Sequence, residues 1–307
     1  NLETRAEYRF RAVPITEYAQ REPPPWIVPE ILPQAELALV IGESGAGKSF
    51  WVYDLCAAIA RGGRWRTREV KQGRVLYVAA ESPGSLILRS KAYVQYHGDE
   101  LLDQMLIVPD APNLMASNDV KDLVKSCNVH GKFSVIVFDT LSACIPGANE
   151  NSGEDLGKAI SHCKGVHRAT GALVILVHHV GKDESKGARG WSGLNAGADT
   201  EITVVRTGDT RRARVSKQKG GVDGLEMPFK LNRVDFGDGL NSCVVLQEDE
   251  GEEQPGAGVR RKRQPSGNVQ RIVLRAVEAL CAVGCEVTVS EGIGGATKGL
   301  VHDPMTS

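Results

Sequence analysis

Residues 37–60 read LALVIGESGAGKSFWVYDLCAAIA, and this stretch decides the fold of the chain. It begins with an apolar run typical of a buried strand and ends with a longer apolar run typical of a helix. Between the two runs, Gly42–Ser49 match the glycine-rich loop G-x-x-x-x-G-K-[ST] in the strand, loop and helix context that this motif requires. With 34 glycines in the chain the bare pattern can arise by chance, but the pattern in this context is much harder to obtain by chance. The sequence therefore predicts a phosphate-binding loop, with a purely structural turn as the alternative.

The chemistry of this loop predicts ATP and Mg²⁺ as cofactors. Backbone N–H groups of a glycine-rich loop can surround a phosphate, and the N-terminus of the following helix adds its positive dipole. We expect Lys48 to reach the β- and γ-phosphates and the Ser49 hydroxyl to bind Mg²⁺. The expected nucleotide-binding residues are Gly42, Glu43, Ser44, Gly45, Ala46, Gly47, Lys48, Ser49 and Phe50.

The whole chain has the composition of an ordinary soluble protein with one sizeable core and a smaller appendage. Its formal net charge of −1 gives no global attraction to nucleic acid, so such a contact must come from local basic loops or from a ring of subunits. The seven cysteines form no C-x-x-C pair, which is typical of reduced thiols in the cytosol. No run is long enough to span a membrane and no secretory signal is visible, so we expect a cytoplasmic protein without a membrane partner.

The order of polar and apolar segments divides the chain into four parts. Residues 1–35 are polar and proline-rich, as in an arm or linker. Residues 36–247 alternate apolar strands with helical stretches, which predicts an α/β core whose mainly parallel sheet is covered on both faces. Residues 248–267 have the composition of a disordered linker, and residues 268–307 are expected to form a small C-terminal helical segment.

The pattern changes near the C-terminal edge of this core. Thr200–Thr207 and Arg211–Lys217 alternate polar and apolar residues around a Gly-Asp turn, which predicts an antiparallel hairpin. Further short strands are expected at residues 225–231 and 243–247. The sheet should therefore end in antiparallel strands.

The second half of an ATPase site is predicted at residues 135–139, which read VIVFD. A buried strand that ends in Asp139 can deliver its carboxylate beside the phosphate-binding loop, where it holds Mg²⁺. The pattern is weak alone because many strands end in Asp. Its position downstream of the loop favours a metal site.

The attacking water needs a base or an orienting group. Asp139 is followed by Thr140, so the base is not the next residue on that strand. Glu81 ends the preceding apolar strand, and the ends of both strands point into the same crevice. We expect Glu81 to be the catalytic base; the alternative is an acid at the start of the helix that follows it.

Two adjacent histidines, His178 and His179, end the next apolar strand. Neighbouring strand residues point to opposite faces, so only one of the pair can face the nucleotide. That histidine can sense the γ-phosphate by donating a hydrogen bond. A plain turn histidine is the alternative, and a zinc pair is disfavoured because no third ligand is close in sequence.

Several motifs occur together in the order and spacing of RecA-type ring ATPases. They are Gly42–Ser49, Ala80-Glu81, residues 138–141 (FDTL), His178-His179 and residues 188–192 (ARGWS). Over about residues 26–235 the chain most resembles the plasmid- and phage-encoded hexameric replicative helicases of the RepA type, which are related to the DnaB family. The resemblance implies a RecA-like core, Lys48 and Ser49 for phosphate and Mg²⁺, Asp139 for Mg²⁺, Glu81 as the base and His179 as the γ-phosphate sensor. It also implies a homo-oligomeric, hexameric ring, single-stranded DNA as a partner, and a primase or a replication initiator as a candidate further partner.

The cation that acts on a neighbouring subunit's nucleotide does not transfer cleanly from this resemblance. Near the position of the finger in RepA-type helicases the chain has apolar residues around Ile202, and Arg206 follows four positions on. The DnaB-like K-x-R motif appears as Lys217-Gln218-Lys219, so its arginine is a lysine. Arg206, Lys217 and Lys219 are the candidates.

Two loops that follow central strands, residues 142–153 and 181–195, correspond to the channel loops of RecA-type rings. The second loop carries Lys182, Lys186 and Arg189 among glycines and small residues, which suits flexible contact with backbone phosphates. Each cation alone is typical of a solvated loop, but copies that converge in a ring would add their fields.

Two further basic clusters are weaker signals. Arg260-Arg261-Lys262-Arg263 is more typical of a solvated charge run than of a nucleic-acid contact. The cluster at residues 64–68, which reads RWRTR, is expected on an outer surface or at a subunit contact.

The sequence thus favours an ATP-driven DNA motor, namely a hexameric replicative helicase. A RecA-like ATPase that regulates or loads other proteins without unwinding is the main alternative. A P-loop kinase is disfavoured because no acceptor-binding lid is evident and Glu81 provides a hydrolytic base.

Overall fold

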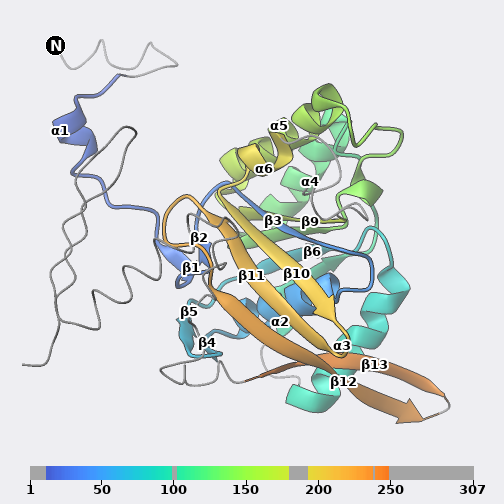
Figure 1. Ribbon diagram of the computed structural model, residues 1–307. Coiled ribbons are helices and arrows are strands. Elements are labelled where there is room, and N and C mark those ends of the chain that lie inside the picture. Colours follow the sequence, from blue (N-terminus) through green and yellow to red (C-terminus); the bar gives the residue numbers. More distant parts are fainter. Residues whose placement is uncertain (1–11, 99–101, 180–192, 238, 249–307) are drawn as a thin grey trace, which may run out of the picture. The chain divides into compact units, whose positions relative to one another are not determined.

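The structure, a computed structural model, describes residues 12–98, 102–179, 193–237 and 239–248 (Figure 1). The expected C-terminal helical segment and nearly all of the expected linker at 248–267 lie outside these residues. The core is an α/β fold, as the alternation of strands and helices predicted.

Within the described residues, nine strands form one sheet in the order β13-β12-β11-β10-β3-β9-β8-β6-β7. The six strands from β10 to β7 in this order pair in parallel, whereas β11, β12 and β13 continue the sheet antiparallel from β10. The strands are β3 (Leu37–Gly42), β6 (Val75–Val78), β7 (Met105–Val108), β8 (Val135–Asp139), β9 (Leu173–His179), β10 (Thr200–Thr207), β11 (Thr210–Gln218), β12 (Glu226–Gly237) and β13 (Leu240–Gln247). The mainly parallel sheet with antiparallel C-terminal edge strands is confirmed.

Helices cover both faces of this sheet (Figure 1). They are α2 (Lys48–Arg61), α3 (Pro83–His97), α4 (Ser117–His130), α5 (Gly153–Thr170) and α6 (Gly193–Gly197), with short 3₁₀ turns at Leu102–Gln104 and Ser142–Cys144. The four-residue helix α1 (Ile15–Tyr18) has no buried residue and does not cover the sheet. The central strand β3 is buried along its whole length. Its Ala38 and Val40 pack into the cluster that contains α2 and α3, and its Leu37, Leu39 and Ile41 pack into the cluster that contains α4 and α5. Burial on both faces explains why the parallel strands read as continuous apolar runs.

The sequence pattern predicted that the core starts at residue 36, but in the structure the core starts earlier. Two short strands, β1 (Trp26–Val28) and β2 (Leu32–Pro33), pair antiparallel in a small sheet of their own. Ile27, Val28 and Ile31 are buried in the same cluster as α2. The prolines just before this segment had suggested a linker, but the apolar residues after them are covered by the core.

The basic cluster at 64–68 is not simply a solvated surface. It forms the hairpin of β4 (Gly63–Trp65) and β5 (Arg68–Val70), in which Trp65 is buried. The Trp65 indole donates a hydrogen bond of 2.8 Å to the buried carboxylate of Asp54 on α2. Arg68 is also buried, and its guanidinium forms an ion pair of 3.0 Å with Glu30. These partners draw two members of the cluster inward.

Candidate functional site

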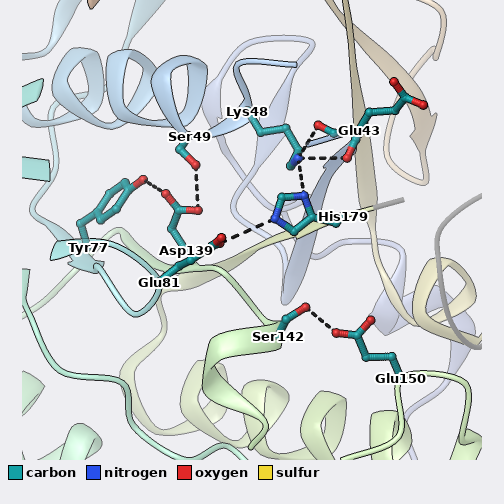
Figure 2. A network of polar contacts seen from close by, with 10 residues as sticks. Glu43, Lys48, Ser49, Tyr77, Glu81, Asp139, Ser142, Glu150 and His179 are labelled. Carbon is teal, nitrogen blue, oxygen red and sulfur yellow. Dashed lines mark hydrogen bonds and ion pairs between the residues drawn. The ribbon is translucent and has the colours of Figure 1, made fainter. Parts of the chain in front are cut away.

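The site lies at the carboxyl ends of four parallel strands. The phosphate-binding loop follows β3, Glu81 comes just after β6, Asp139 ends β8 and His179 ends β9. Their side chains converge on one cavity of about 240 Å³ (Figure 2). The cavity is lined by Ser44, Gly45, Gly47, Lys48, Ser49, Phe50, Tyr77, Ala79, Glu81, Ser82, Leu86, Arg89, Asp139, His179 and Leu231. This arrangement is the one expected where parallel strands deliver polar groups to a common edge.

The backbone of the loop depends on glycine at two positions. Gly42 has φ +155°, and a Cβ there would lie 2.1 Å from the carbonyl oxygen of Val204 on β10. Gly47 has φ +99° and directly precedes the first turn of α2. A side chain at either position would clash or strain the backbone, so the glycines let the loop curl against the sheet at the helix N-terminus.

Lys48 is buried and uses its ammonium group within the chain. Its Nζ donates hydrogen bonds of 2.9 Å each to the carbonyl oxygens of Gly42 and Glu43, and lies 3.0 Å from Nδ1 of His179. Burial lowers the pKa of Lys48 from 10.5 to about 8, although the carboxylates of Asp139 and Glu81 oppose this shift. Burial thus disfavours the charged form of Lys48, and an anionic ligand beside it would stabilise that form.

Asp139 is buried at the end of β8 and accepts a hydrogen bond on each oxygen. Ser49 Oγ donates to Oδ1 at 3.0 Å, and the hydroxyl of Tyr77 donates to Oδ2 at 2.5 Å. A hydroxyl from the loop and a carboxylate from the next-but-one strand are the oxygen ligands that Mg²⁺ accepts.

Of the two histidines that end β9, only one faces the cavity and Glu81. His178 is fully buried, whereas the side chain of His179 is about 30% exposed and faces the cavity. Nε2 of His179 lies 3.6 Å from Oε2 of Glu81, whose side chain is half exposed (Figure 2). The alternation expected along the strand therefore turns the second histidine, and not the first, toward Lys48 and Glu81.

The residues present fit a nucleotide with a divalent cation. The loop glycines and the N-terminus of α2 suit a phosphate, and Lys48 supplies a buried cation. Ser49 and Asp139 lie within hydrogen-bonding distance of one another, as two ligands of one hard cation would. Phe50, Leu86 and Leu231 give the cavity an apolar wall that suits a base.

Sequence reasoning missed three polar residues of this cavity, Tyr77, Ser82 and Arg89. Arg89 is 8% exposed on α3, its Nη1 donates to the Ser49 carbonyl at 3.3 Å, and its guanidinium lies 4.3 Å from the centre of the Phe50 ring. The signal for Arg89 was its position three residues after Leu86 on the buried stripe of α3, where a cation is unusual. Tyr77 carried no comparable signal, because tyrosine is common in buried strands.

The three candidate cations for a neighbouring site all have partners within the chain. Arg206 donates to the carbonyl oxygen of Gly208 in its own hairpin at 2.8 Å. Lys217 donates to the Asn195 carbonyl at 2.5 Å, and Lys219 pairs with Asp199 at 3.0 Å. On β10, Thr203 pairs with Ile41, the residue just before the phosphate-binding loop, and Arg206 lies three residues further along the strand. Lys217 pairs with Glu201, near the other end of β10.

The expected DNA contacts, Lys182, Lys186 and Arg189, lie outside the described residues. Within the described part of the chain, no helix is long and apolar enough to cross a membrane.

A family described as the AAA domain matches residues 4–185, which is more than half of the chain. The chain therefore belongs to this family, and with its sheet order it is a RecA-type P-loop ATPase. Among solved structures 422 chains match. One is described as the crystal structure of the RadB recombinase; it is 16% identical, with a TM-score of 0.47, and the match covers 64% of this chain and 87% of that one. A comparison with curated proteins finds no match.

Proposed function

We propose that this ATPase is a DNA motor, namely a hexameric replicative helicase that moves along single-stranded DNA. The observation that carries the hydrolytic part is the convergence of Lys48, Asp139, Glu81 and His179 on one cavity. The DNA and ring parts are supported by the resemblance of the motifs and by the basic loop after His179.

Each residue has a proposed task in hydrolysis. Lys48 and the loop N–H groups bind the phosphates, and Ser49 and Asp139 hold Mg²⁺, which supplies charge neutralisation when bound. Glu81 accepts a proton from the attacking water, because its carboxylate is accessible and not tied to a guanidinium or an ammonium in the described residues. His179 changes partner when the γ-phosphate is present, since its ring already lies between Lys48 and Glu81.

Two steps would link this chemistry to movement. His179 ends β9, and the basic segment at 181–195, which is expected to form a loop, follows it in the sequence. A change at the γ-phosphate would therefore have a short covalent path to that segment. A cation from a neighbouring subunit would complete each site and make hydrolysis depend on assembly.

A regulatory or loader ATPase is the second candidate, and one observation favours it. The side chains of Arg206, Lys217 and Lys219 each bind a partner in their own chain. Each would have to leave that partner to reach the nucleotide of a neighbouring subunit. In that case ATP binding would switch the chain between two states without unwinding.

DNA-stimulated ATP turnover separates these functions. A motor should hydrolyse ATP faster when single-stranded DNA is added, and should separate a forked duplex only with hydrolysable ATP. Stimulation without strand separation would favour the regulatory candidate. ATP turnover that DNA leaves unchanged would contradict the motor.

A further inference from the structure

Tyr77 on β6 donates a hydrogen bond to Asp139, and core packing alone does not explain this contact. The side chain is fully buried, and a phenylalanine would fill almost the same space. Its hydroxyl nevertheless ends 2.5 Å from Oδ2 of Asp139, the carboxylate expected to hold the metal ion. A buried tyrosine hydroxyl needs a hydrogen-bond partner, and here the partner belongs to the site.

The direction of this hydrogen bond follows from the two groups. A phenolic hydroxyl carries a hydrogen to donate and a carboxylate carries none, so Tyr77 donates and Asp139 accepts. Because Ser49 Oγ already donates to Oδ1, the two contacts together hold both oxygens of the carboxylate.

The tyrosine ring is itself held in place by an aromatic cluster. Tyr53 on α2 packs edge-on against Tyr77 with ring centres 6.1 Å apart, and Tyr93 on α3 packs edge-on against Tyr53 at 5.6 Å. The Tyr53 hydroxyl donates to Ser90 Oγ at 3.1 Å, so it has its own partner and does not touch Asp139. The donor to Asp139 is thus anchored by two helices as well as by its strand.

We propose that Tyr77 is a positioning residue for the metal: it holds Oδ2 of Asp139 so that Oδ1 faces the Ser49 hydroxyl, where Mg²⁺ is expected. Such outer hydrogen bonds orient ligating carboxylates and typically change metal affinity or activity by about 10–100-fold when removed. This inference rests on the proposed role of Asp139 in ATP hydrolysis.

The test measures Mg²⁺ directly, apart from turnover. Binding of a fluorescent, non-hydrolysable ATP analogue is titrated with Mg²⁺ in the wild type, in Tyr77→Phe and in Tyr53→Phe. Tyr77→Phe should raise the half-saturating Mg²⁺ concentration by about tenfold or more. Its affinity for the analogue in EDTA should stay within about twofold of the wild type, because the phosphate-binding loop is intact.

Tyr53→Phe is the matched control, since it removes a hydroxyl from the same aromatic cluster without touching Asp139. Its Mg²⁺ titration should follow the wild type, while its thermal unfolding reports any loss of packing. A Tyr77→Phe titration that overlays the wild type overturns the inference, and so does an equal shift in both variants.

A second variant pair tests the partner. In an Asp139→Asn background, Tyr77→Phe should shift the Mg²⁺ titration no further, because the group it positions is gone. An additive shift would mean that Tyr77 acts elsewhere. The wild type could bind the analogue in a Mg²⁺-dependent way and yet not hydrolyse ATP. That result would contradict the proposed function but not the inference about Tyr77.

Discussion

The Nζ atom of Lys48 lies 3.0 Å from Nδ1 of His179, and this contact assigns the proton of the histidine ring. An ammonium only donates, so Nδ1 accepts and a neutral ring carries its proton on Nε2, which faces Glu81 at 3.6 Å. The other two hydrogens of Lys48 go to the carbonyl oxygens of Gly42 and Glu43. A phosphate that binds Lys48 must therefore displace at least one partner, and the histidine is the one that can turn toward the γ-phosphate.

The role of Glu81 is tested by replacing it with the isosteric amide. Glu81→Gln should keep ATP affinity within about twofold and lower the turnover rate by about 10²–10⁴-fold, because the amide cannot accept the proton of the attacking water. Lys48→Ala is the comparison: it should lose nucleotide binding as well as turnover. Steady-state hydrolysis and equilibrium binding of the same preparations give both quantities. Turnover near the wild-type rate in Glu81→Gln would place the base elsewhere.

The lowered pKa of Lys48 predicts how ATP binding depends on pH. Without nucleotide the ammonium titrates near pH 8, and phosphate charges beside it favour the protonated form. Binding should therefore take up a proton at pH 8.5 but not at pH 6.5, and affinity should fall by up to about tenfold per pH unit above 8. Calorimetry in buffers of different ionisation enthalpy measures this uptake. Lys48→Arg, which stays charged throughout, should show none.

Asp54 gives a stability prediction at a distance from the nucleotide. Burial raises its pKa from 3.8 to about 6, so the fold favours the neutral form and bears the cost of the charged one. That cost is fully present above about pH 6 and disappears as the pH falls toward 3.8. Asp54→Asn keeps an acceptor for the Trp65 indole and should stabilise the protein at pH 8 by up to about 3 kcal/mol. Thermal unfolding should show a smaller gain at pH 5, and an equal or larger gain there would contradict this assignment.

The sequence predicted the core strands and the phosphate-binding loop. It also predicted that the site lies at the carboxyl ends of the parallel strands. The reason is local: apolar runs such as residues 135–138 report burial on both faces, and Gly42–Ser49 is a contiguous motif. The same locality explains the errors at the N-terminus, where β1 and β2 are too short to give a periodic pattern.

Contacts between distant residues were not predictable in this way. Tyr77 meets Asp139 across 62 positions of sequence, and Arg89 meets Ser49 across 40. Trp65 and Arg68 looked like members of a surface basic cluster because their partners, Asp54 and Glu30, come from other elements. Strand and helix periodicity carries no information on such pairs until the elements are packed.

The identity of a cation that acts on a neighbouring subunit can be found with mixed variants. Arg206→Ala, Lys217→Ala and Lys219→Ala are made singly, and the functional one should lose about 10³-fold or more in turnover with unchanged ATP affinity. Mixing that variant with Glu81→Gln should restore activity, because a subunit with an intact base then meets a neighbour with an intact cation. Recovery on mixing requires action between subunits.

Lys219→Ala needs its own control in this series. Its ammonium pairs with Asp199, which also accepts from the backbone N–H groups of Glu36 and Leu37. A loss of thermal stability in Lys219→Ala would therefore report a structural contact. If no variant is rescued on mixing, and activity per chain is constant on dilution, hydrolysis does not need a neighbour.

The last prediction concerns Lys182, Lys186 and Arg189, the cations of the segment after His179 that is expected to form a loop. Contacts made by such side chains go to phosphates, so single-stranded DNA binding should be nearly indifferent to sequence. Each phosphate neutralised should contribute about 0.7 log unit of affinity per tenfold change in salt. Replacing all three by alanine should abolish DNA stimulation, reduce the salt slope, and leave basal ATP turnover unchanged.

A control of equal charge separates this loop from a general loss of positive field. Lys121, Lys125 and Lys132 are exposed on or next to α4, and replacing them by alanine removes the same three charges. That variant should bind DNA with the slope of the wild type, because phosphate contacts act within about 10 Å at ordinary salt. If instead the loop variant keeps the wild-type slope and stimulation, the loop does not contact DNA and the regulatory ATPase becomes the better account of this chain.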